Sequence, residues 1–326
     1  MSAAQIEVLT IGRSGIDIYP LQVGVGLEEV TSFGKFLGGS PTNIAVAAAR
    51  MGHTSAAITG VGDDPFGRFV RTEMVRLGVS DEFVVVNKDF NTPVTFCEIF
   101  PPDDFPLYFY REPSAPDLQL RPVDIPEQAV RDAKVFVFSG TGLSEEPSRT
   151  AHHHALTIRA KAGWTIADLD YRPMFWQDEK TASREIGGIL ESVNVAVGNR
   201  EECWIAVGET DPDRAADALL ERGVEIAIVK QGPKGTLAKT REERSEVPVT
   251  EVETMNGLGA GDSFAGSLSH ALIMGWDVPK AIQFASTAGA IVVSRLECST
   301  AMPMEDEVFD LIARTPQAAP IVETLS

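Results

Sequence analysis

Six apolar runs of strand length recur along the 326-residue sequence, and segments with helix-start signals lie between them. Most of the runs are continuous rather than alternating, which is typical of strands covered on both faces. Ser40 and Pro41 open one helical segment as an N-cap serine and a first-turn proline, with Gly52 beyond its end. This order predicts an α/β fold in which a mainly parallel sheet carries helices on both faces. The six runs span residues 6–12, 56–62, 134–140, 164–170, 193–199 and 225–232.

Two segments, residues 15–39 and 91–113, break this rhythm because they lack helical periodicity and carry prolines, glycines and aromatic or β-branched residues. Within the second, residues 95–100 and 107–111 have strand composition and flank a proline-rich stretch. We predict two antiparallel strands there. We interpret both segments as a small β-lid inserted in one domain over residues 1–326, with irregular surface loops as the alternative.

The net charge of −19 argues against nonspecific binding to nucleic acid or to an anionic membrane as the main task. No run approaches the roughly 18 apolar residues of a membrane-spanning helix, and the sequence does not open with a basic region and an apolar core. The three cysteines are widely spaced and form no Cys-x-x-Cys pair. We expect a cytoplasmic protein that acts on small molecules.

The stretch from Asn256 to Leu268 alternates three glycines with other residues and then opens an apolar-periodic helix. Unpaired backbone N–H groups and the positive end of the helix dipole lie at such a helix start. Gly257, Gly259 and Gly261 have no side chain that would block a phosphate from those groups, so the pattern favours an anion cradle. A tight strand-to-helix turn is the alternative.

Asp262 follows the last glycine, where its charge would repel a bound phosphate unless the carboxylate takes part in the chemistry. In phosphoryl transfer, hydrogen-bond donors stabilise the transferring group while a carboxylate accepts the proton of the attacking hydroxyl. An aspartate at a helix start is also a common cap. Spacing alone leaves both roles open.

Two other nucleotide-binding motifs are missing, because the sequence has no G-x-x-x-x-G-K-[ST] loop and no G-x-G-x-x-G after the first predicted strand. Residues 37–43 (LGGSPTN) and 257–264 (GLGAGDSF) instead resemble the two signatures of the ribokinase-like (phosphofructokinase-B) carbohydrate kinases. The resemblance covers nearly the whole chain. It implies a Rossmann-like core with a β-lid, ATP as the phosphoryl donor and Mg²⁺ as the bridging metal ion.

The resemblance also implies roles for the residues at the family's motif positions. Asp262 resembles the general base, and the three residues before it resemble the anion hole. By this resemblance, the anion hole corresponds to Gly259, Ala260 and Gly261, and the sugar site corresponds to Asp17, Gly38, Gly39 and Asn43. The N-x-x-E element that positions Mg²⁺ and phosphate through water corresponds to Asn199 and Glu202. The turn beside the nucleotide corresponds to Lys230, Gly232 and Gly235.

Two adjacent positions depart from the family pattern. Asn256 and Gly257 stand where the family usually has Asp-Thr. Residues 285–297 occupy the place of the helix and loop that lie near adenine and, in many members, near a monovalent cation. The loss of the carboxylate and the hydroxyl leaves activation by K⁺ open.

Two arginines point to an acidic acceptor. Arg111 and Arg172 each end a predicted strand, in segments expected to face one pocket, and a planar guanidinium suits a carboxylate. Lys35 adds a third positive charge near the glycine loop in this interpretation. The alternatives are surface ion pairs and, for Arg172, contact with ATP phosphates.

Four stretches, residues 33–43, 92–118, 168–176 and 256–262, resemble one subfamily whose acceptor is a sugar acid of inositol catabolism. We therefore predict an ATP-dependent sugar-acid kinase that phosphorylates a C6 hydroxyl, with a homodimer through the lid as an implied assembly. Within kinases, 2-keto-3-deoxygluconate or fructose are alternative acceptors. A catalytically silent regulator that binds sugar or nucleotide is the alternative from another class.

Overall fold

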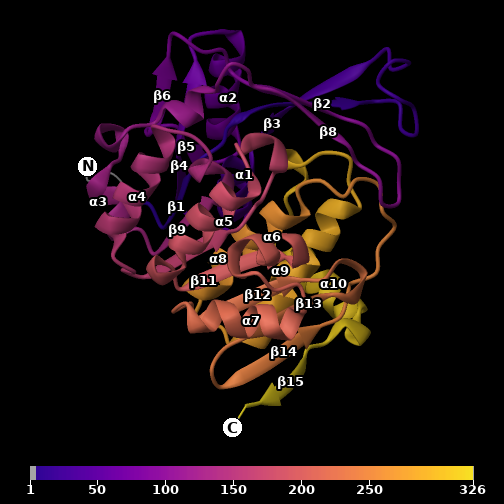
Figure 1. Ribbon diagram of the computed structural model, residues 1–326. Helices are drawn as coiled ribbons and strands as arrows, with labels where there is room; N and C mark the ends of the chain where they lie inside the picture. The colour runs from indigo at the N-terminus through magenta and orange to yellow at the C-terminus, as the bar shows by residue number, and fades with distance from the viewer. Residues whose placement is uncertain (1–4, 326) are drawn as a thin grey trace.

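The computed structural model describes residues 5–325, which form one large sheet with helices on both faces and a second, smaller sheet (Figure 1). The strands of the large sheet are β1 (Val8–Ile11), β4 (Ser55–Gly62), β5 (Val79–Ser80), β6 (Val84–Asn87), β9 (Val135–Ser139), β10 (Trp164–Asp168), β11 (Val195–Asn199), β12 (Ile226–Lys230), β13 (Thr236–Lys239), β14 (Glu243–Val247) and β15 (Ile321–Thr324). Their order is β15-β14-β13-β12-β11-β10-β9-β1-β4-β5, and β6 also pairs with β4.

Helices cover both faces of this sheet. α1 (Ser40–Arg50), α8 (Ala260–Ile273) and α9 (Val278–Val293) pack on one face. The other face carries α3 (Glu127–Asp132), α4 (Ser148–Arg159), α5 (Glu179–Gly188), α6 (Arg200–Val207) and α7 (Pro212–Glu221). α2 (Pro65–Arg76) packs against β4 and β5, and α10 (Glu305–Arg314) packs on α9. Within residues 5–325, no helix has both the length and the apolar content that crossing a membrane requires.

The continuous apolar runs are explained by burial on both faces of the sheet. Phe136 and Phe138 of β9 belong to the core under α3–α7, whereas Val135 and Val137 belong to the core under α1, α8 and α9. From β5 to β12 in the sheet order, the adjacent strands pair in parallel with one another. Each of the six predicted runs overlaps one of these strands, so the predicted α/β class is confirmed.

The smaller sheet contains β3 (Phe33–Gly38), β2 (Gly15–Pro20), β7 (Val94–Cys97) and β8 (Leu107–Tyr110), in that order. β7 and β8 pair antiparallel, as the sequence predicted. In Figure 1, β2 and β8 extend away from the large sheet at the upper right. The two segments without helical periodicity therefore form a sheet rather than irregular loops.

Two details differ from the sequence prediction. The N-cap of α1 is Gly39 rather than Ser40, because the backbone there has φ 98° and passes so close to Arg13 that a Cβ would lie 2.5 Å from its carbonyl oxygen. The antiparallel strands β13, β14 and β15 extend one side of the large sheet and were not predicted. β15 is exposed along its whole length and β14 is rich in charged residues, so neither carries the apolar signal of the parallel strands.

The fold gathers polar residues at one edge of the large sheet. Asp168, Asn199 and Lys230 are the last residues of β10, β11 and β12, which are neighbouring parallel strands. Ligands of open α/β sheets bind outside the carboxyl ends of the strands. The N-terminus of α8 and the inner part of the small sheet contribute residues to the same region.

Candidate active site

Two cavities adjoin at the N-terminus of α8, and both are lined by Lys230, Gly257 and Gly261. The first, which we call the charged cavity, has a volume of about 320 Å³. The second, the apolar cavity, has a volume of about 720 Å³. The charged lining residues of the first are Arg13, Asp17, Arg111, Asp168, Asp170, Arg172, Glu202, Lys230 and Asp262. The second is lined mainly by glycine, proline and small apolar residues.

The start of α8 has free backbone donors. Gly259 is the N-cap with φ 81°, and no side chain caps the helix. Within residues 5–325, the N–H groups of residues 259–262 have no hydrogen-bond acceptor. A Cβ at Gly259 would lie 2.8 Å from Sγ of Cys298, and one at Gly257 would lie 2.9 Å from the Phe105 ring. The glycines therefore allow a tight turn and also leave its amides open to an anion.

Asp262 lies in the first turn of α8 and lines the charged cavity. Its Oδ2 accepts a hydrogen bond of 2.8 Å from Nδ2 of Asn43, and none of the described backbone amides donates to its carboxylate. The side chain is therefore not used as a helix cap. Burial raises the pKa of Asp262, and the hydrogen bond from Asn43 opposes that rise. A carboxylate in this environment is more basic than an exposed aspartate.

Asp17 approaches the same cavity from the small sheet. Its Oδ2 accepts a hydrogen bond of 3.0 Å from the hydroxyl of Tyr19, and burial raises the pKa of Asp17 to about 7 despite that bond. Gly38 on the paired strand makes room for it, since a Cβ there would lie 2.1 Å from Oδ1 of Asp17. Oδ1 of Asn43 is buried without a partner among the described residues. Asp17 and Asn43 thus offer hydrogen-bond acceptors to a polyhydroxy ligand.

Three arginines line the charged cavity, each paired with a carboxylate. Arg13 and Arg172 both donate to Asp170, while Arg111 donates to Asp117 over 2.8 Å. Burial alone would raise the pKa of Asp170, but the two arginines hold it well below its usual range. The structure thus brings the predicted Arg111 and Arg172 together.

Arg13 was missed by the sequence reasoning. It lies two residues after the end of β1, in the stretch GRSG, so the available signal was a charge just beyond a buried parallel strand. Lys35 was predicted to lie in the site, but the structure places it elsewhere. It is exposed, and its ammonium lies 3.8 Å from the centroid of the Phe69 ring in α2. Because Lys35 pairs with Ile18 whereas Asp17 pairs with Phe36, alternation places Lys35 on the face opposite Asp17. We do not retain Lys35 in the site.

Asn199 and Glu202 form a capping box at the start of α6, where each side chain accepts from the other residue's backbone N–H, over 2.9 and 2.6 Å. Both residues line the charged cavity. Burial raises the pKa of the neighbouring Asp168 to about 7, even though Lys230 acts against that rise. Carboxylates around a partly solvated cavity suit Mg²⁺, which usually keeps several waters. The residues present thus fit a hydrated magnesium ion.

Lys230 lies between the two cavities. Burial would lower its pKa, but the carboxylates of Asp168 and Glu202 outweigh burial and raise it. A Cβ at Gly261 would lie 3.3 Å from its Nζ, which places the ammonium beside the open amides of α8. One cation and a set of free N–H groups therefore converge where the cavities meet. Such a position suits a phosphoryl group.

The apolar cavity lies between the β12–β13 turn, the segment before α8, and α9. Gly232 and Gly235 line it, and Gly235 has φ 89° with no room for a Cβ beside the carbonyl oxygen of Val247. Val249, Val252, Ala290 and Val293 are among its other lining residues. A flat apolar ring fits this lining. Phosphates attached to such a ring would reach Lys230, which also lines the cavity.

Asn256, at one of the two positions that depart from the family pattern, is fully buried. Its Nδ2 donates to the carbonyl oxygen of Leu296 over 2.7 Å, and its Oδ1 accepts from the N–H of Leu258 over 3.0 Å. The side chain thus ties the glycine turn to the segment after α9.

A model of the pfkB family of carbohydrate kinases matches residues 5–305. The chain belongs to this family. A relative from Geobacillus thermodenitrificans named 5-dehydro-2-deoxygluconokinase is 34% identical, covering 97% of this chain and 96% of the relative. A relative of the same name from Photobacterium profundum is 33% identical and covers 96% of each chain. The family resemblance found in the sequence is confirmed, and the protein is a carbohydrate kinase.

The fold is shared with solved kinases. A protein from E. coli described as ribokinase II, in complex with ATP and Mg²⁺, superposes with a TM-score of 0.86 at 25% identity. The match covers 95% of this chain and 99% of that protein. The predicted ribokinase-like fold, with a core sheet and a small second sheet, is therefore confirmed.

Proposed function

We propose that the protein transfers the γ-phosphoryl group of ATP to the C6 hydroxyl of 5-dehydro-2-deoxy-D-gluconate. One observation carries the proposal: Asp262 lines the charged cavity beside amides of α8 that have no acceptor among residues 5–325, where the two cavities meet. A base next to an anion site is what phosphoryl transfer to an alcohol requires. The names of the two relatives support the choice of acceptor.

The charged cavity holds the acceptor in this proposal. Asp17 and Asn43 accept hydrogen bonds from its hydroxyls, with Gly38 and Gly39 giving the chain its close approach. Arg111 and Arg172, joined by Arg13, receive the carboxylate. Their guanidinium groups line the same cavity and retain donors beyond those used by Asp117 and Asp170.

The apolar cavity holds the nucleotide. The adenine ring lies among the apolar residues, Gly232 and Gly235 let it approach the backbone, and the phosphates extend towards Lys230. Asn199 and Glu202 would hold Mg²⁺ through water, and when bound this ion would neutralise charge on the phosphates. The assignment of ATP and Mg²⁺ to this protein is supported by the structure of the E. coli protein described as ribokinase II, which contains both.

In the transfer step, Asp262 accepts the proton of the C6 hydroxyl as the hydroxyl oxygen attacks the γ-phosphorus in line. The bond between that phosphorus and the bridging oxygen of the β-phosphate breaks, and ADP leaves. Asn43 holds the carboxylate in place through its hydrogen bond. The N–H groups of Gly259, Ala260 and Gly261 stabilise the charge that develops on the transferring group, and Lys230 adds a positive charge beside them. The raised pKa of Asp262 suits a base that must take a proton near neutral pH.

The small sheet completes the proposal as a lid. Residues 15–39 and 91–113 are inserted in a single kinase domain over residues 1–326, and the lid covers the acceptor while excluding water. Aromatic side chains such as Phe33 and Tyr110 are exposed on this sheet, which supports a homodimer through the lid. We place the enzyme in the cytoplasm.

A coupled ADP-release assay with a panel of acceptors tests the function. We expect the highest kcat/KM with 5-dehydro-2-deoxy-D-gluconate, and lower values with 2-keto-3-deoxygluconate and fructose. A higher kcat/KM with either alternative would overturn the acceptor assignment, and no ADP release with any acceptor would favour a silent binding protein. Replacing K⁺ by Na⁺ in the same assay tests the cation dependence.

A further inference from the structure

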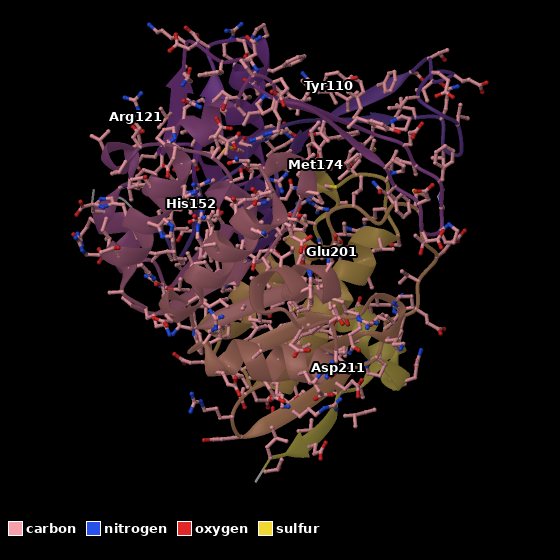
Figure 2. The ribbon with its side chains drawn as sticks, viewed as in Figure 1. Tyr110, Arg121, His152, Met174, Glu201 and Asp211 are labelled. Atoms are coloured by element: carbon pink, nitrogen blue, oxygen red, sulfur yellow. The ribbon has the colours of Figure 1, made fainter. Side chains whose placement is uncertain are left out.

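The loop after β10 brings an aromatic ring to the arginines of the charged cavity. Phe175 ends a short 3₁₀ helix (Pro173–Phe175) and is half-buried. Its ring centroid lies 5.5 Å from the guanidinium carbon of Arg13 and 4.9 Å from that of Arg111. Figure 2 labels Met174, the preceding residue, between Tyr110 of β8 and Glu201 of α6 in this view. The loop therefore reaches the small sheet from the large one.

The same ring also contacts the small sheet directly. Phe109 of β8 packs against Phe175 with ring centroids 4.8 Å apart and planes at 71°. Phe109 and Arg111 are two residues apart, so they share one side of the chain and both line the charged cavity. Phe175 thus touches one arginine that follows β1 of the core and one that follows β8 of the small sheet.

Each of the two guanidinium groups is held both by hydrogen bonds and by contact with the Phe175 ring. Arg13 donates through Nε to Thr141 and through a terminal nitrogen to Asp170, and its face lies near Phe175. Arg111 donates through one terminal nitrogen to Asp117, also with its face near Phe175. Nε of Arg111 is buried and has no partner among the described residues. A guanidinium has five N–H donors, so both groups retain donors for a ligand.

The salt bridges of these arginines are uneven, because Arg13 and Arg172 share the single carboxylate of Asp170. The three guanidinium groups of Arg13, Arg111 and Arg172 face the two carboxylates of Asp117 and Asp170. A planar anion that accepts two hydrogen bonds, such as a carboxylate, fits the unused donors. A neutral hydroxymethyl group in the same place would leave the donors poorly paired.

We propose that Phe175 is a positioning residue that determines specificity, because its ring holds the guanidinium groups of Arg13 and Arg111 where they receive the carboxylate of the acceptor. Phe175 itself does not line the charged cavity, so it acts through the two arginines. The negative face of an aromatic ring attracts a cation most strongly where water is excluded. The inference rests on the proposed function, since it requires an acidic acceptor.

The test compares Phe175→Leu and Phe175→Tyr with the unaltered enzyme, using 5-dehydro-2-deoxy-D-gluconate and its analogue with a hydroxymethyl group at C1. Leucine fills a similar volume without a ring, whereas tyrosine keeps the ring face. For Phe175→Leu we expect a rise in the KM of the acid of about tenfold, with kcat nearly unchanged and the KM of the neutral analogue unaltered. Phe175→Tyr should retain the preference for the acid.

Two other outcomes overturn the inference. An equal loss of kcat/KM for both acceptors in Phe175→Leu would mean that the ring only packs the small sheet on the core, and an unchanged preference would mean that the arginines need no ring. Met174→Ala is the matched control, because Met174 is 61% exposed in the same turn and should leave both KM values as they are. If the unaltered enzyme shows no preference for the acid, the proposed acceptor fails first and the inference falls with it.

Discussion

The charged and the apolar cavity meet at the same helix end but are built from opposite kinds of residues. The charged cavity has nine Arg, Lys, Asp and Glu side chains in its lining, whereas the apolar cavity has Lys230 and Glu251. In the proposed function, the first would recognise its ligand through side chains from both sheets, and the second through shape and exposed backbone. Substitutions that change charge should therefore act on the first cavity, and substitutions that add volume should act on the second.

The largest expected effect is a loss of turnover without a change in the affinity for ATP. Asp262→Asn removes the proton acceptor but keeps the size of the side chain, so turnover should fall by about 10²- to 10⁴-fold. The affinity for ATP should stay the same, because Asp262 does not line the apolar cavity. Single-turnover phosphoryl transfer and calorimetric titration with ATP measure the two quantities. Retained turnover would refute the assignment of Asp262 as the base.

A substitution where the two cavities meet should affect catalysis with respect to both ATP and the acceptor. Gly259→Ala forces a side chain onto a backbone with φ 81° and against Cys298, so the amides of α8 must shift. The loss of aligned donors should lower kcat by about 10²- to 10³-fold. Steady-state assays with varied ATP and varied acceptor measure the effect.

Gly188→Ala is the control for this substitution. Gly188 ends α5, and a Cβ there would have no neighbour within 4 Å. This variant should keep full activity and gain up to about 1 kcal/mol in the free energy of unfolding. Full activity in Gly259→Ala would show that the glycine is needed for neither turn nor anion binding.

Added volume should affect the apolar cavity alone. Ala290 in α9 lines that cavity, so Ala290→Phe should raise the KM of ATP by about ten- to hundredfold, as expected from an overpacking cost of about 1–3 kcal/mol. The KM of the acceptor should not change, because Ala290 is absent from the lining of the charged cavity. A parallel rise in both KM values would mean that the two cavities are not separate sites.

The smallest expected effect concerns stability and pH. Burial raises the pKa of Asp17 from 3.8 to about 7, so the folded state binds a proton more tightly than the unfolded state. The free energy of unfolding therefore falls as pH rises between these values, and below about pH 4 this effect disappears.

Asp17→Asn removes that loss of stability. The variant should be more stable than the unaltered protein at pH 8, with little difference at pH 4. Urea denaturation at both pH values measures it. A variant that is less stable at pH 8 would show that the ionised Asp17 is well compensated in the fold. Acceptor affinity should fall in the same variant.

Several features could be predicted from the sequence because they depend on local interactions. The continuous apolar runs predicted the parallel strands because burial on both faces leaves no room for alternation, as Val135 and Phe136 show. The glycines before Asp262 predicted open amides because a helix start has unpaired donors. The proline- and glycine-rich segments predicted the second sheet. β13, β14 and β15 were not predicted, because β13 and β15 are only four residues long and β14 is rich in charged residues.

The contents of the site were decided by the tertiary structure. Arg13 and Asp170 are 157 residues apart and meet because β1 and β10 both pair with β9. Lys35 lies close in sequence to the glycine loop, yet the register of β2 and β3 turns it to the other face. Sequence gives the direction of a side chain relative to its own strand. The pairing of distant strands, set by burial of the whole core, decides which side chains share a cavity.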